Sequence, residues 1–245
     1  MTFARVLAVN SLLAVIFLFI YGDWGWIVTS LLYYKIVVGF LGNQISQHRY
    51  FSHNSFKTTK IKKYFLYFVS LTTGVNPLDY ALVHRHHHLH SDSPGDVHSK
   101  LNRFSDIFFP ISGKTSSMER IKIGRVLDSD LRGFYKYHIA TILFVLVLTA
   151  LLSWKVAVFV LLAGVGWNYI HMILLRVWLV HTKLPGSYQN FDSKDSSWNN
   201  KWVQLLDIGE GLHNNHHYNP NAYNQAMVPG EFDPAGYIVR KFFKV

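Results

Sequence analysis

The sequence predicts an all-α integral membrane protein, with four transmembrane helices in two hairpins, a cytoplasmic helical cap and one amphipathic or re-entrant helix. Three observations lead to this prediction. Half of the 245 residues are hydrophobic, the formal net charge is nevertheless +10, and four apolar stretches approach the ~20 residues that a helix needs to cross a bilayer. The length is that of a single domain, residues 1–245. A nucleic-acid-binding protein would show basic patches without such long apolar runs, so no nucleic-acid partner is expected.

The predicted transmembrane helices are paired by two very short connections. The first reads GDWGW and the second SWK, and both contain tryptophan, which is enriched at membrane interfaces. The first apolar stretch is not interpreted as a signal peptide, because no small-residue cleavage site follows and a second apolar run begins at once. The four helices are expected at residues 6–22, 26–47, 137–153 and 155–181.

The basic residues are concentrated away from these two connections. Nearly all of them lie before the first helix, between the hairpins or in the C-terminal part of the chain. By the positive-inside rule, both termini and the polar regions 48–136 and 182–245 are cytoplasmic, and the protein is a multi-pass membrane protein. Lys35 lies within the second helix and requires either snorkelling or an internal partner.

A fifth apolar stretch, residues 64–83, is interrupted by Gly74 and Pro77. If this stretch crossed the membrane, the histidines that follow it would lie on the opposite side from His48 and His53. An amphipathic or re-entrant helix keeps all of these histidines on one side, so this is the arrangement that we expect.

Histidines occur in three clusters within the polar regions: HRYFSH, HRHHHLHSD and HNNHH. The second and third clusters share the spacing HxxHH, which places the three histidines on one face of a helix at about 100° per residue. In the second cluster His86 and His90 lie on the opposite face. His48 and His53 are five residues apart, and they converge only if the helix loosens at its end or the metals sit to one side.

The repeated spacing predicts metal binding rather than a pH sensor, which would not need it. Cysteine is absent from the sequence, which excludes thiolate ligands. Eight well-placed imidazoles exceed the four ligands of a typical zinc site, so two metals are expected. Imidazole binds iron, zinc and copper alike, and ligand type therefore leaves the metal open. The eight are His48, His53, His84, His87, His88, His213, His216 and His217.

The same segments resemble the membrane fatty acyl desaturase family, in particular the stearoyl-CoA desaturase-like proteins of the short bacterial type with three histidine boxes. The segments HRYFSHNSFK, HRHHHLHSDSPGDVHS and NFDSKDSSWNN, the last followed by GEGLHNNHHYNP, carry the resemblance, which covers nearly the whole chain. It implies a non-haem di-iron centre at the cytoplasmic face, ligated by the eight histidines. It also implies O2-dependent insertion of a cis double bond into an acyl-CoA or acyl-lipid, with two electrons from an external donor. Zinc can displace iron from imidazole sites after overexpression.

The resemblance further implies a ninth histidine ligand near the end of the fourth helix. His181 is the histidine expected there, although the Asn-x-x-x-His motif of the family is absent and Val177 stands four residues before it. No catalytic residue is expected beyond the metal ligands.

Several polar residues beside the histidine boxes are further candidates. Asp92, Asp207 and Glu210 are expected either to hold ligand imidazoles through the distal N–H or to act as caps and surface charges. Asn76 and Tyr80, just before the second box, are expected to line the path of the substrate.

Histidine boxes alone do not separate a desaturase from a di-iron membrane hydroxylase, ketolase or alkane monooxygenase. The contexts GEGLHNNHH and HRHHHLHSD favour the desaturase. A zinc-dependent membrane hydrolase and a catalytically silent metal-binding protein are the alternatives from other classes. The sequence contains no His-Pro-Gly-Gly haem-domain motif. A ferredoxin or cytochrome b5-like electron donor is therefore expected, and the basic face would attract an acidic partner of this kind.

Overall fold

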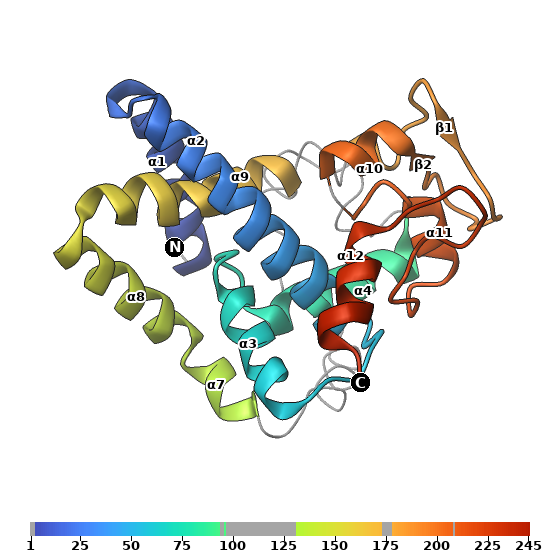
Figure 1. Ribbon diagram of the computed structural model, residues 1–245, viewed down its shortest axis with the longest axis horizontal. Helices are drawn as coiled ribbons and strands as arrows, with labels where there is room; N and C mark the ends of the chain where they lie inside the picture. The colour runs from blue at the N-terminus through green and yellow to red at the C-terminus, as the bar shows by residue number, and fades with distance from the viewer. Residues whose placement is uncertain (1–2, 94–95, 97–130, 173–177, 208) are drawn as a thin grey trace.

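The computed structural model describes residues 3–93, 96, 131–172, 178–207 and 209–245. In these ranges the chain is mostly helical, as predicted. It has one two-stranded antiparallel sheet, made of β1 (Ser187–Tyr188) and β2 (Asn199–Asn200) (Figure 1). Residues 97–130 of the predicted cap lie outside the described residues.

The N-terminal part forms the first predicted hairpin. Helix α1 (Phe3–Tyr21) is followed by α2 (Trp24–Tyr33), which continues without interruption into the π-helix η1 (Tyr34–Ser52). Asp23 caps α2 by accepting a hydrogen bond from the backbone N–H of Trp26 at 3.1 Å. The helices Phe3–Tyr21 and Trp24–Ser52 are both long and apolar enough to cross a membrane.

The second predicted hairpin consists of α8 (His138–Leu152), η3 (Val156–Leu162) and α9 (Ala163–His171), preceded by the short α7 (Arg132–Lys136). Within the described residues, the apolar helices His138–Leu152 and Val156–His171 are each shorter than a full membrane span. Helix α9 packs closely on α1, since a Cβ atom at Gly166 would lie 2.3 Å from the carbonyl oxygen of Ser11. Residues 173–177 of the predicted fourth helix lie outside the described residues.

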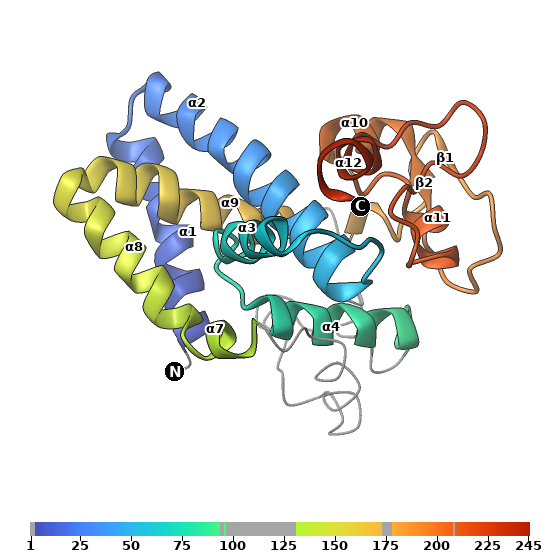
Figure 2. The ribbon, with the colours of Figure 1, turned by 60° about the horizontal axis from the view of Figure 1, so that its bottom comes forward.

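The two hairpin connections lie at the same end of the molecule. In both ribbon views, the α1–α2 turn and the α8–η3 turn are remote from the elements that carry the second and third histidine clusters (Figure 1, Figure 2). Both turns therefore lie on the side of the molecule away from these histidine clusters.

The stretch 64–83 was expected to form one helix, and the structure divides it between two: α3 (Lys60–Leu71) and α4 (Pro77–His90). The chain turns at Gly74, whose φ of +78° favours glycine. Asn76 then caps α4 and Pro77 occupies its first turn. Because of the turn, the second histidine cluster returns beside η1.

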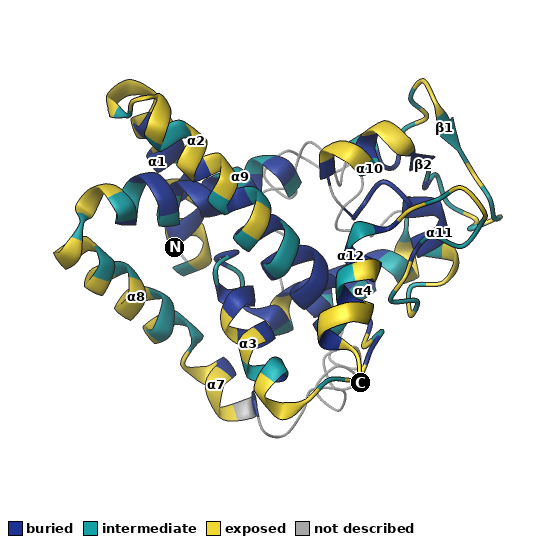
Figure 3. Ribbon diagram, in the orientation of Figure 1, coloured by how far each residue is buried: buried dark blue, intermediate teal, exposed yellow. Residues whose placement is uncertain are grey.

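The C-terminal part contains α10 (Lys201–Asp207), α11 (His213–Tyr218), α12 (Pro234–Ile238) and the π-helix η5 (Val239–Phe243). Arg49 of η1 forms a buried two-point ion pair with Asp233, at 2.7 and 3.1 Å, and so holds this part against η1. Ile45, Leu66 and Val239 are fully buried in the same core. Buried residues are concentrated where η1, α4 and α11 meet, whereas α8 is largely exposed (Figure 3).

Candidate metal centre

All nine predicted histidine ligands meet in one region, although they come from four separate segments. They are contributed by the end of η1, by α4, by the segment before β1 and by α11. Their ring nitrogens form two groups, and within each group the candidate ligand atoms lie within 4.8 Å of one another.

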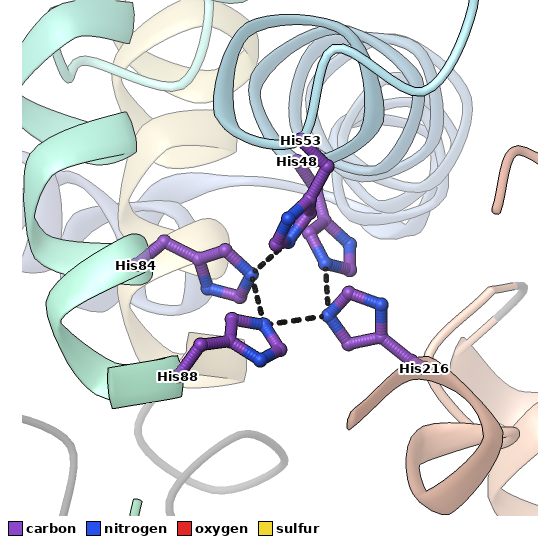
Figure 4. A group of neighbouring side chains, drawn as sticks. All are labelled: His48, His53, His84, His88 and His216. Atoms are coloured by element: carbon purple, nitrogen blue, oxygen red, sulfur yellow. Dashed lines mark hydrogen bonds between the residues drawn. The ribbon is translucent and has the colours of Figure 1, made fainter. Parts of the chain in front are cut away.

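The first group consists of His48, His53, His84, His88 and His216 (Figure 4). The Nε2 atom of His216 lies 2.8 Å from that of His48 and 2.9 Å from that of His88. The Nε2 atom of His84 lies 2.8 Å from that of His53 and 3.1 Å from that of His88. Five imidazole nitrogens therefore surround a common centre.

The second group consists of His87, His181, His213 and His217. The Nε2 atoms of His181 and His213 lie 3.0 Å apart. The ring of His87 is 5.1 Å from those of both His181 and His217, measured between centroids. The structure thus places His181 beside three of the box histidines, where a ninth ligand was expected.

Each HxxHH motif contributes to both groups. In α4, His84 and His88 belong to the first group and His87 to the second. In α11 the order is reversed: His216 belongs to the first group, while His213 and His217 belong to the second. One helix face therefore carries ligands for two adjacent centres.

The π-helical geometry of η1 explains how His48 and His53 converge. The backbone N–H of His53 donates to the carbonyl oxygen of His48 at 3.2 Å, a hydrogen bond between residues five apart. This i→i+5 pattern stacks residues five apart on one side of the helix, where an ideal α-helix would separate them. The two rings are 5.1 Å apart.

The donor set and its spacing fit two metal ions. Two nitrogens bound at right angles to one metal, with bonds of 2.0–2.1 Å, would lie about 2.8–3.0 Å apart. The nitrogen pairs quoted above span 2.8 to 3.1 Å. In addition, the Nε2 atom of His217 is buried and has no hydrogen-bond partner among the described residues, as expected of an atom reserved for a metal.

Four carboxylates hold the outer nitrogens of four histidines. Nδ1 of His48 lies 2.9 Å from Glu210, that of His87 2.9 Å from Asp96, that of His181 3.2 Å from Asp92 and that of His217 2.6 Å from Asp195. When Nδ1–H donates to a carboxylate, the lone pair of a neutral imidazole is left on Nε2, which faces the group.

Two of these carboxylates, Asp92 and Glu210, were expected from the sequence. Asp96 and Asp195 were missed, although both lie inside segments that carry the family resemblance, SDSPGDVHS and NFDSKDSSWNN. Their position within these segments was the sequence signal that could have identified both residues.

Burial sets the protonation of the second and third clusters. It lowers the pKa of His84, His87, His88 and His216 well below the usual range, and neighbouring histidines lower it further. These imidazoles are therefore neutral at pH 7, which is the form that binds metals.

Two carboxylates are held in the ionised form. Burial alone would raise the pKa of Asp92 and of Asp195, but hydrogen bonds outweigh it and the pKa of each lies below its ordinary value. The donors are His181 and Ser196 for Asp92, and His217 and Ser197 for Asp195. An ionised carboxylate accepts the imidazole N–H that it orients.

Asp207 differs from the expectation that it supports a box histidine. Its Oδ1 lies 2.6 Å from Nε2 of His171, a histidine of α9 that belongs to neither group. His86 and His90 also lie outside both groups, and their rings are 4.4 Å apart. The opposite-face argument for these two histidines agrees with their positions.

Asn76 and Tyr80, the predicted substrate residues, lie close to the second box. The Asn76 side chain caps α4, accepting from the N–H of Leu78 at 2.9 Å. The ring of the buried Tyr80 stacks on that of His84, with centroids 5.6 Å apart. Neither residue lines the apolar cavity among the predicted membrane helices.

An apolar cavity of about 160 Å³ lies among the predicted membrane helices. It is bounded by α1, the end of α2, α3, α8, η3 and α9. Leu7, Leu71 and Leu146 are among its apolar lining residues. A site with such a lining accepts hydrocarbon in preference to a polar ligand.

The sequence model of the family described as fatty acid desaturase matches residues 24–227. The chain is 33% identical over 212 residues to the sn-1 stearoyl-lipid 9-desaturase of Anabaena variabilis, with 82% of this chain and 75% of the relative covered. It is 30% identical over 210 residues to the chloroplastic palmitoyl-monogalactosyldiacylglycerol delta-7 desaturase of Arabidopsis thaliana, with 84% and 56% covered.

A further relative is the delta-9 acyl-lipid desaturase 2 of Arabidopsis thaliana, which is 29% identical over 232 residues, with 92% of this chain and 74% of the relative covered. The chain therefore spans between about half and three quarters of the length of these relatives. The family match begins at α2, includes the second hairpin, and contains all nine grouped histidines. The chain belongs to the fatty acid desaturase family.

Proposed function

We propose that this chain is an O2-dependent di-iron fatty acyl desaturase. In the overall reaction, a CH2–CH2 unit of an acyl chain, O2, two electrons and two protons give a cis CH=CH unit and two molecules of water. The observation that carries this proposal is the pair of adjacent, buried, all-imidazole groups in a chain of the fatty acid desaturase family.

Each histidine group would hold one iron. The first has five imidazoles and the second four. When bound, the two irons would supply the oxidising chemistry with O2 that an unactivated CH2 requires.

The carboxylates provide the orientation. Glu210 serves both groups, because it lies 2.9 Å from Nδ1 of His48 and 3.3 Å from Nδ1 of His213. Asp92, Asp96 and Asp195 orient three histidines of the second group. These contacts fix the tautomer and the ring plane of each imidazole before a metal binds, which increases metal affinity.

The apolar cavity supplies a site for hydrocarbon. We assign to it the part of the acyl chain remote from the reacting carbons, because its walls are apolar and lie within the predicted membrane helices. The relatives include a desaturase named for a lipid-linked substrate, from Anabaena variabilis, and an acyl-CoA 5-desaturase from Anemone leveillei. The proposal is therefore made for the acyl chain, whichever carrier bears it.

The membrane arrangement that supports this function has four spans, with both termini and the metal centre on the cytoplasmic side. The positions of both hairpin turns, remote from α4 and α11, support it (Figure 2). A net charge of +10 supports docking of an acidic electron donor such as a ferredoxin or a cytochrome b5-like protein.

The test is expression in a desaturase-deficient host that is fed a labelled saturated fatty acid. We expect a labelled cis alkene that depends on O2 and is lost in the His216→Ala variant. The matched control is His90→Ala, at an exposed histidine outside both groups, which should retain activity. A hydroxylated product without alkene would identify a hydroxylase, and turnover without O2 would identify a hydrolase.

A further inference from the structure

Helix α10 (Lys201–Asp207) has an outward face that is apolar. Trp202, Leu205 and Leu206 are 70%, 72% and 65% exposed. Their spacing of i, i+3 and i+4 places them on one side of the helix. The yellow outer surface of α10 in Figure 3 shows this face. Large side chains so exposed on one short helix mark a surface that contacts another apolar phase.

The inward face of the same helix carries a buried carboxyl group. Asp207 is 5% exposed, and its Oδ1 lies 2.6 Å from Nε2 of the buried His171. Val203 lies on this side as well and is buried. A surface helix in a water-soluble protein has the reverse pattern, with apolar residues inside and polar residues outside.

The end of α10 is attached to a predicted membrane helix. The Nζ atom of Lys35 donates to the carbonyl oxygen of Leu206 at 2.7 Å, and so satisfies one of the last carbonyls of α10. At 1.5 Å per residue, Lys35 lies about 17 Å along the helix from Trp24. That depth is within the ~30 Å thickness of the hydrocarbon core. Lys35 therefore has the internal partner that its position requires.

We propose that α10 is an in-plane membrane anchor, with Trp202, Leu205 and Leu206 inserted among the lipid acyl chains at the cytoplasmic interface. The occupant of this surface is the bilayer, because the Lys35 contact places α10 beside a membrane-crossing segment. A tryptophan beside an exposed lysine, Lys201, is also the composition of an interfacial helix. This inference rests on the proposed membrane arrangement.

The anchor is coupled to the third histidine box. Oε1 of Gln204 accepts a hydrogen bond from the N–H of Gly211 at 2.8 Å, two residues before His213. The same side chain donates to the carbonyl oxygen of Phe232 at 3.2 Å. The anchor thereby fixes the height of the third box relative to the lipid in which an acyl substrate resides.

The absence of cysteine from the sequence allows a direct test by site-specific labelling. Leu205→Cys is labelled with an environment-sensitive fluorophore in the full chain, reconstituted into phosphatidylcholine vesicles. Leu148→Cys on the exposed side of α8 provides the membrane reference, and Asn221→Cys provides the aqueous reference. Quenching by nitroxide-bearing lipid is compared with quenching by iodide.

We expect the label at Leu205 to resemble that at Leu148, with blue-shifted emission, strong quenching by nitroxide lipid and iodide quenching several-fold weaker than at Asn221. A label at Leu206→Cys should behave in the same way. This second site controls for the case in which the Leu205 substitution itself disturbs α10. Iodide quenching at Leu205 equal to that at Asn221, with Leu148 still protected, would overturn the anchor alone. Loss of protection at Leu148 would instead overturn the membrane arrangement. Efficient disulfide cross-linking between Leu205→Cys copies would assign the face to a dimer and overturn the anchor.

Discussion

Nδ1 of His217 lies 2.6 Å from Oδ2 of Asp195, while the Nε2 atom of the same ring is buried and without a hydrogen-bond partner among the described residues. One ring nitrogen thus contacts an ionised carboxylate, and the other faces the remaining histidines of the second group. The carboxylate therefore orients an imidazole whose other nitrogen could bind a metal.

Replacing Asp195 with Asn removes the anionic acceptor while keeping the size of the side chain. We expect metal affinity of the second group to fall about 10- to 100-fold, as is typical when such an outer contact is lost. Competition with a chelator of known affinity measures it. Asp192→Asn, at an exposed aspartate of the same segment, is the control. Equal metal affinities in the two variants would refute the orienting role of Asp195.

His181 is the ligand with the weakest sequence support, and its role can be tested separately. His181→Ala should weaken the binding of one Fe²⁺ equivalent and leave the other unchanged, because His181 lies only in the second group. Anaerobic calorimetric titration resolves the two equivalents. The exposed His90, in the second cluster but in neither group, provides the matched alanine control. An unchanged titration for His181→Ala would show that His181 is not a ligand.

The buried ion pair between Arg49 and Asp233 should contribute to stability rather than to chemistry. Asp233→Asn leaves the buried Arg49 charge without its counter-charge, a change that typically costs about 3–5 kcal/mol. For a chain of this size, the midpoint of thermal unfolding in detergent should fall by about 10 °C. The double variant Arg49→Met/Asp233→Leu should recover part of the loss. An unchanged midpoint for Asp233→Asn would contradict this assignment.

Filling the apolar cavity should discriminate between acyl chains by length. Leu146→Trp adds bulk to a cavity of about 160 Å³, and we expect it to reduce turnover of long chains more than that of shorter ones. Leu148→Trp, on the exposed side of the same helix, should leave the preference unchanged. Product analysis with a mixture of saturated chains measures the effect. A uniform reduction at all lengths would argue against an acyl chain in this cavity.

Much of the site could be predicted from the sequence because the spacing of the histidines within each cluster is local. HxxHH on a helix places its three histidines on a shared face, and the charge pattern predicts that the three clusters lie on one side of the membrane. Sequence reasoning grouped His84, His87 and His88 by face, but it could not divide them between two centres. That division depends on how the second and third boxes are placed beside η1. Contacts between distant segments, such as the ion pair between Arg49 and Asp233, hold the C-terminal part of the chain against η1.

Other features depended on geometry that sequence periodicity does not contain. The i→i+5 pattern that joins His48 and His53 departs from an ideal α-helix, and the partners of His87 and His217 lie at separations without a regular period. Asp207 stands near a histidine box in the sequence, yet the fold directs it to His171. The division of residues 64–83 at Gly74 and Pro77 was signalled by those two residues, but the hydrophobic pattern alone suggested one helix.

The most direct test of the central claim, two adjacent metal centres with separate histidine sets, is the iron content after anaerobic reconstitution. We predict two Fe²⁺ per chain in the native protein, one in His84→Ala/His88→Ala and one in His213→Ala/His217→Ala, because each double variant disables a single group. The intrinsic fluorescence of both double variants should match that of the native protein, which verifies that they are folded. A single Fe²⁺ in the native protein, or loss of both metals in each folded double variant, would contradict the account.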